Sequence, residues 1–126
     1  MREVGVVIGI LEEPLYWHSP GDRSVAYFPD SVDLWGVLWA YRSNLLGFAH
    51  SHPGAGRPMP SSTDLTTFAA IETGLGERYN WYIVSKDRMV GVYWVGPGRC
   101  NYTVKDVVNE PGWADELRRL SHYEEE

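Results

Sequence analysis

Two histidines and an aspartate stand at a spacing that suits a metal ion. His50 and His52 lie two residues apart in an apolar segment with the character of a β-strand, where side chains at i and i+2 point to the same face. Asp64 follows a loop rich in proline and glycine, just inside a segment that Pro60 and Ser61 mark as the start of a helix. Two neutral imidazoles and one carboxylate are an ordinary ligand set for catalytic Zn²⁺, with water in the fourth position.

Each half of this pattern also has a simpler interpretation. A His-x-His pair is weak by itself, because most histidines in proteins only form hydrogen bonds. The Ser61-x-x-Asp64 pattern is also typical of a helix N-cap followed by an acidic residue in the first turn. The joint pattern carries more weight: His-Ser-His-Pro at the end of an apolar strand, then a loop, then Pro-Ser-x-x-Asp at a helix start. Together these features predict a metal site.

The joint pattern resembles the JAMM (JAB/MPN+) metallopeptidases, most closely their short prokaryotic and phage-type members. The matching residues are Gly47, His50, Ser51, His52, Pro53, Pro60, Ser61, Asp64 and Leu65. The chain also follows the family's order: a glutamate at the first strand, a helix, the His-x-His strand and the Ser-x-x-Asp helix. The resemblance implies a cytidine-deaminase-like α-β-α domain of the α+β class, with a central mixed sheet flanked by helices.

The resemblance also implies a role for each matching residue. His50, His52 and Asp64 match the family's ligands for Zn²⁺, the implied cofactor. Ser61 matches the serine that helps to hold the oxygen of the tetrahedral intermediate. Glu3 is the best match to the glutamate that acts as general acid and base.

The sequence departs from the family's usual spacing at two places. The loop between His52 and Ser61 is one residue longer than usual, which a loop absorbs easily. Many members have Glu-x-x-Gly in the first strand, which would place Arg2 at the glutamate position here. A shift of one residue turns a strand side chain to the other face, so the register decides whether Glu3 points at the metal. Glu12 and Glu13 are the alternatives for the base.

The chain length of 126 residues predicts one domain over 1–126, and we expect 124–126 to be a frayed acidic tail. Hydrophobic patterning predicts strands at 4–11, 24–28, 45–52, 80–85, 88–95 and 100–104. Helices are expected at 31–43, 61–74 and 111–123. Prolines and a glycine indicate a loop over 14–21. Strands and helices are mixed and several strands look antiparallel, which independently favours the α+β class.

Several residues outside the motif are also assigned from their surroundings. Trp35 and Trp39 are one helical turn apart and are expected in the core, and Cys100 is expected to be buried in a strand. His18 and His122 are expected at the surface. Ser51, between the two histidines, is expected to face away from the metal and to be structural.

Composition narrows the classes of partner. Eleven basic and seventeen acidic residues give a net charge of −6, which argues against nucleic acid or an anionic membrane as the main partner. No apolar run is long enough to span a bilayer. A single cysteine excludes an internal disulfide and a cysteine-based zinc site, and it suits a cytoplasmic setting.

Three hypotheses follow for the function. The first is a zinc-dependent metallopeptidase or isopeptidase with a protein or peptide substrate. The resemblance suggests the flexible C-terminal tail of a ubiquitin-like or sulfur-carrier protein. The second is a non-catalytic zinc-binding MPN scaffold or a phage tail-assembly module. The third, a DNA-associated role as in the RadC branch, is disfavoured by the acidic charge. The oligomeric state is left open.

Overall fold

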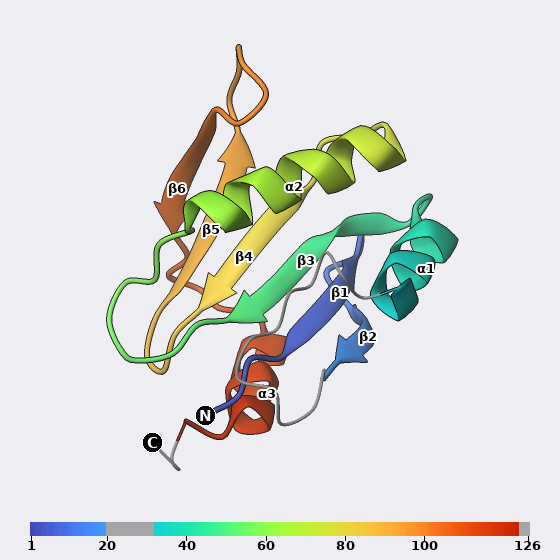
Figure 1. The fold of residues 1–126 in the computed structure, drawn as a ribbon. Coiled ribbons are helices and arrows are strands. Elements are labelled where there is room, and N and C mark those ends of the chain that lie inside the picture. The colour runs from blue at the N-terminus through green and yellow to red at the C-terminus, as the bar shows by residue number, and fades with distance from the viewer. Residues whose placement is uncertain (20–31, 124–126) are drawn as a thin grey trace.

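Six β-strands form one mixed sheet in the part of the chain that the structure, a computed structural model, describes: residues 1–19 and 32–123. The strands run in the order β2-β1-β3-β4-β5-β6 (Figure 1). Their bounds are β1 (Gly5–Gly9), β2 (Pro14–His18), β3 (Leu45–Ser51), β4 (Asn80–Val84), β5 (Met89–Trp94) and β6 (Tyr102–Asp106). The β3–β4 pair is parallel and the other pairs are antiparallel, which confirms the mixed sheet.

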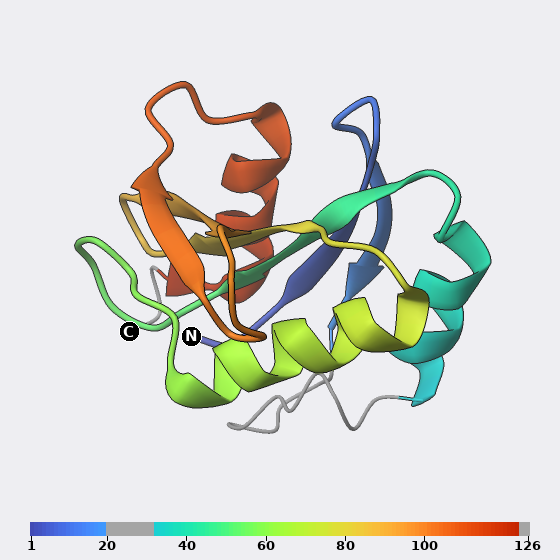
Figure 2. The same ribbon diagram turned by 90° about the horizontal axis from the view of Figure 1, so that it is seen from above.

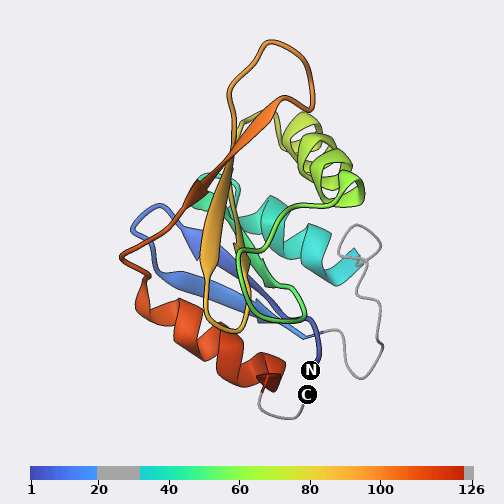
Figure 3. The ribbon, with the colours of Figure 1, turned by 90° about the vertical axis from the view of Figure 1, so that its left-hand side faces the viewer.

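Helices cover both faces of the sheet, as Figures 2 and 3 show. One face packs against α1 (Val32–Tyr41) and α2 (Ser62–Leu75), and the other against α3 (Gly112–Ser121). The inner strands are apolar on both faces because both faces are covered. In β1, for example, Val7 packs toward α1 and α2, while Val6 and Ile8 pack toward α3. This α-β-α arrangement confirms the α+β class.

Gly47 is required by the close approach of two strands. A Cβ atom on this residue would lie 1.6 Å from the carbonyl oxygen of Asn80, on the neighbouring strand β4. Since the obstacle is backbone, no side-chain movement could make room for it. Gly47 therefore allows β3, the strand that carries the two histidines, to pair closely with β4.

The expected core position of the two tryptophans in α1 is wrong. Trp35 and Trp39 are 39% and 48% exposed, whereas Leu34 and Leu38 are almost fully buried. Both pairs have the same spacing of four residues, so periodicity alone could not choose between them. One residue corresponds to about 100° around a helix, and the structure turns the leucines inward.

Four other local predictions need correction. Residues Pro14–His18, expected in a loop, form the edge strand β2, and His18 is buried there rather than at the surface. Cys100 is exposed in a turn, because the last strand begins only at Tyr102. His122 is half-buried and ends α3 in a left-handed conformation. The predicted strand at 24–28 and the tail at 124–126 lie outside the described residues.

No helix in the described ranges has the length and apolar character needed to cross a membrane.

A buried carboxylate ties α2 to the sheet. Glu72 is 3% exposed and accepts hydrogen bonds from the backbone N–H of Tyr79 at 2.8 Å and the indole N–H of Trp81 at 3.1 Å. Its other oxygen accepts from the guanidinium of Arg78 at 3.0 Å and from the hydroxyl of Tyr102. Burial and the hydrogen bond to Glu72 raise the pKa of Tyr102 above its ordinary value, which keeps its hydroxyl protonated as a donor.

Replacing Glu72 with glutamine should lower the free energy of unfolding by about 2 kcal/mol, because a buried amide cannot accept from all four donors. Chemical denaturation measures this loss. The matched control is Glu77→Gln, at an exposed residue just after the same helix, which should change stability by less than about 0.5 kcal/mol. Equal effects of the two substitutions would contradict the structural role of Glu72.

Candidate metal centre

The two histidines reach the same face of the sheet from the end of β3. His50, the second-last residue of β3, is 2% exposed, and His52 is the first residue after the strand. Their rings lie 4.8 Å apart between centroids, with Nε2 atoms 3.0 Å apart. The His50 ring is also flanked by Phe48 and Phe68, at centroid distances of 6.5 and 6.1 Å. The aromatic neighbours restrict the orientation of the buried imidazole.

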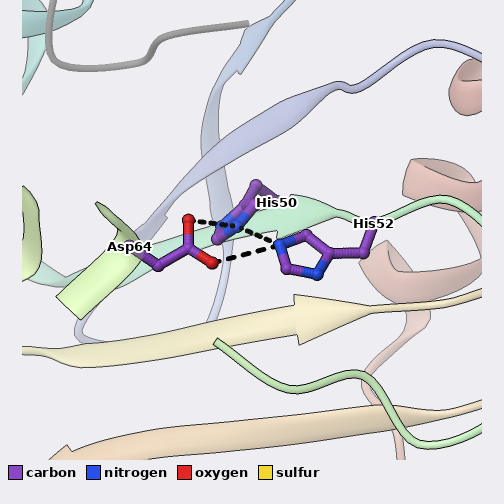
Figure 4. Close-up of side chains that lie close together, drawn as sticks. All are labelled: His50, His52 and Asp64. Carbon is purple, nitrogen blue, oxygen red and sulfur yellow. Dashed lines mark hydrogen bonds and ion pairs between the residues drawn. The ribbon is translucent and has the colours of Figure 1, made fainter. Parts of the chain in front are cut away.

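The carboxylate of Asp64 completes the group from the first turn of α2 (Figure 4). Its Oδ1 lies 3.5 Å from Nε2 of His50, and its Oδ2 lies 3.2 Å from Nε2 of His52. In the described ranges, these three residues are the group of histidine, cysteine and acidic side chains close enough to hold a metal ion. The structure therefore brings together all three ligands expected from the sequence.

The three side chains lie close enough to share one ion. With bonds of about 2.0–2.2 Å, ligand atoms around tetrahedral Zn²⁺ stand about 3.3–3.6 Å apart. The observed contacts are 3.0 Å between the two Nε2 atoms and 3.2 and 3.5 Å from these atoms to the two different oxygens of Asp64, and one ligand atom from each residue lies within 4.8 Å of the others. Two imidazoles and a carboxylate supply three ligands and leave a fourth position open, as in catalytic zinc sites.

The same aspartate also caps its helix. Its Oδ2 accepts a hydrogen bond from the backbone N–H of Ser61 at 2.9 Å, and the Ser61 hydroxyl accepts from the N–H of Asp64 at 3.0 Å. This reciprocal pair is a capping box, which fixes the start of α2 next to the histidines. The two interpretations of the Ser-x-x-Asp pattern therefore hold together: one carboxylate both caps the helix and faces the imidazoles.

The surroundings of Asp64 favour its charged form. Burial opposes ionisation, but hydrogen bonds with His50 and His52, the electrostatic interaction with His50 and the N–H of Ser61 outweigh it. They hold the pKa of Asp64 well below its usual value. A carboxylate at this position is ready to bind a cation.

Ser61 lies next to Asp64 with a hydroxyl available for donation. Its side chain is exposed, and its Oγ acts as an acceptor toward Asp64. Within the described residues the structure gives its O–H no acceptor, so the hydrogen can point to a molecule bound beside the ligands. The position suits the role that the resemblance implies for Ser61.

The pairing of β1 with β3 indicates on which face of the sheet Glu3 is expected. Gly5 lies opposite His50, and the carbonyl of Val4 accepts from the N–H of Ser51 at 3.0 Å. Val4 packs in the cluster on the α3 side. Strand alternation carried back from Gly5, the first residue of β1, predicts Glu3 on the face of Gly5 and His50.

Arg2 lies on the opposite face. Its backbone N–H donates to the carbonyl of Ser121 at 2.8 Å, and its guanidinium donates to the carbonyl of Leu120 at 3.3 Å. Arg2 is therefore bound to the end of α3, although the usual family spacing would have placed it at the glutamate position. The shorter spacing in this chain is compatible with Glu3 as the matching residue.

The two alternative glutamates follow the wrong end of β1. That end, at Gly9, pairs with Leu45 rather than with His50. Five residues of strand separate Leu45 from His50, which corresponds to about 17 Å. Glu12 also lines a cavity on the α3 face, the side of the sheet opposite the imidazoles. The geometry favours Glu3 over Glu12 and Glu13.

Sequence analysis missed the residue that holds the backbone of His52. The hydroxyl of Tyr123 donates to the carbonyl of His52, a residue 71 positions earlier in the chain. No local pattern marks such a contact, because it depends on how α3 crosses the sheet. Ser51, as expected, faces away from the ligands: its Oγ accepts from the hydroxyl of Ser121 in α3 at 2.8 Å.

Comparison with known proteins agrees with this geometry. No curated protein matches the chain. The family profile described as prokaryotic homologs of the JAB domain matches residues 3–118, which cover Glu3, the three candidate ligands and most of α3. Because the match extends over most of the sequence, the chain belongs to the prokaryotic homologs of the JAB domain.

Proposed function

We propose that this protein is a zinc-dependent metallopeptidase or isopeptidase. The observation that carries the proposal is the convergence of possible ligand atoms of His50, His52 and Asp64 within reach of one ion. Two features support hydrolysis rather than metal binding alone. A serine hydroxyl stands beside the ligands, and the strand register favours a glutamate on their face.

Zinc is the metal that best suits this group. Imidazole nitrogen and carboxylate oxygen in a tetrahedral arrangement favour Zn²⁺, whereas Mg²⁺ and Ca²⁺ prefer octahedral or larger shells of oxygen. When bound, zinc supplies a Lewis acid that polarises a carbonyl and lowers the pKa of its water to about 7.

The side chains of the protein would then divide the remaining work. Glu3 takes a proton from the attacking water and returns it to the leaving amine, a role that needs a carboxylate on the face of the ligands. Ser61 donates a hydrogen bond where negative charge develops on the carbonyl oxygen, a contribution of about 3 kcal/mol in comparable sites. Asp64 stays ionised as a ligand because of its lowered pKa.

For the substrate, we propose a protein or peptide with an extended tail, as at the C-terminus of a ubiquitin-like or sulfur-carrier protein. An extended tail can lie beside a sheet edge or loop and bring its peptide bond to a site at a strand end. The net charge of −6 disfavours nucleic acid as the substrate.

Cleavage of a defined tail tests the proposal. The substrates are ubiquitin-like proteins extended at the C-terminus by a short reporter peptide, with mass spectrometry locating the new end. We expect cleavage with zinc-loaded protein, loss on chelation and recovery when zinc is restored. Cleavage that persists in chelator would contradict zinc catalysis. Stoichiometric zinc without cleavage of any tail would favour the non-catalytic scaffold.

A further inference from the structure

The C-terminal turn of α3 lies behind the candidate metal centre, on the opposite face of the sheet. Two residues at this end, Ser121 and Tyr123, contact the segments that carry the site. Ser121 contacts Ser51, between the two histidines, and Tyr123 contacts His52 itself. The carbonyl of Ser121 also accepts from the backbone N–H of Arg2, next to Glu3. The end of α3 and the residues just after it thus contact both segments that carry the candidate site.

The backbone of His52 lies just outside the regular strand β3. It follows the last residue of β3, where the regular strand ladder ends. Its N–H donates to the carbonyl of Val84 on β4 at 2.8 Å, while its own carbonyl accepts from Tyr123. The Tyr123 hydroxyl also lies 3.0 Å from the carbonyl of Val84. The hydroxyl therefore lies where the ends of β3 and β4 meet, and it adds a second hydrogen bond to the backbone of His52, whose N–H is already bonded to β4.

The chain directs Tyr123 to this junction by a sharp change of direction. His122 ends α3 with φ 60° and ψ 46°, the left-handed conformation that commonly terminates helices. The turn sends Tyr123 back onto the sheet, where its side chain is 3% exposed. This position uses the hydroxyl as well as the ring. A phenylalanine would fill the same space but could not donate a hydrogen bond to the carbonyl of His52.

We infer that Tyr123 is a positioning residue for the metal centre: its hydroxyl fixes the backbone of His52 and so the direction of that imidazole. The inference rests on the proposed zinc site, since it concerns one of its ligands. Hydrogen bonds that orient metal ligands from outside the coordination sphere commonly change metal affinity by 10–100-fold. Tyr123 touches no reacting atom, and its effect passes through His52.

The test compares Tyr123→Phe with Tyr79→Phe. Tyr79 is also buried, at 7% exposure, but its hydroxyl has no hydrogen-bond partner in the described part of the chain. Both substitutions remove one buried hydroxyl and keep the ring. Zinc affinity, from competition with a chromogenic chelator, should fall about 10-fold in Tyr123→Phe and stay unchanged in Tyr79→Phe. The visible spectrum of the Co²⁺-substituted protein should also shift only in Tyr123→Phe, because it reports coordination geometry.

A purely structural role would give a different result. The midpoint of thermal unfolding of the zinc-free protein separates the two roles, since positioning acts mainly on the metal-bound state. Unchanged zinc affinity and an unchanged Co²⁺ spectrum, or a loss of zinc-free stability that accounts for the whole change, would overturn the inference. A Tyr123→Phe variant that does not fold even with zinc would show a structural role for the hydroxyl and would also overturn the inference. Failure of the wild-type protein to bind zinc would instead refute the proposed function.

Discussion

Replacing Glu3 with glutamine should lower kcat by about 10²–10⁴ while zinc remains bound, because general acid–base catalysis contributes that factor. Glutamine has the shape of glutamate but cannot take a proton. The strand register supports this residue, since Gly5 lies opposite His50 and alternation carried back from Gly5 predicts Glu3 on the same face. Turnover of a tail substrate and the zinc content of the same preparation measure the two effects.

The matched control for Glu3 is Glu12→Gln. Glu12 lines a cavity on the α3 face, so its substitution should leave turnover within about twofold of the wild type, a change of less than about 0.5 kcal/mol in the barrier. Full activity in Glu3→Gln would show that another group is the base. Loss of activity in Glu12→Gln instead would show that β1 presents its far end to the substrate, contrary to its observed pairing with β3.

Replacing Asp64 with asparagine should abolish most of the stabilisation that zinc confers and leave the helix cap intact. The asparagine oxygen can still accept from the N–H of Ser61, whereas a neutral amide is a poor zinc ligand. Zinc at about 1,000 times its dissociation constant stabilises a protein by about 4 kcal/mol. In a chain of this size that corresponds to a rise of about 10–20 °C in the unfolding midpoint.

Differential scanning calorimetry with and without zinc measures this rise. Asp115→Asn is the matched control, because Asp115 is an exposed acid in the first turn of another helix, α3. It should keep the full zinc-induced rise. Asp64→Asn should lose that rise but unfold near the wild-type midpoint without zinc. If both variants responded to zinc alike, Asp64 would not be a ligand.

The ligands were predictable because their geometry is local. Alternation along one strand puts His50 and His52 on one face, and a capping pattern puts Asp64 in the first turn of a helix. The face of Glu3 was not predictable in this way. It depends on the pairing of β1 with β3, two segments separated in the sequence by β2 and α1, and a change of one residue in that register would reverse it.

Other errors have equally specific causes. Leu34 and Leu38 share the spacing of Trp35 and Trp39, so helical periodicity could not decide which pair faces the sheet. The strand β2 begins at a proline, which usually marks a loop, but an edge strand tolerates proline because only one side of it is paired. The contact between Tyr123 and His52 joins residues 71 positions apart, so no local sequence pattern indicates it.

The metal content of the purified protein tests the central claim most directly. Elemental analysis of the wild type and of His52→Ala, each dialysed after exposure to zinc, gives the number of ions bound per chain. The account predicts about one zinc in the wild type and none in His52→Ala. His18→Ala, at a buried histidine outside the group, should keep its zinc. A wild-type protein without zinc, or a His52→Ala variant that retains it, would contradict the assignment of the site.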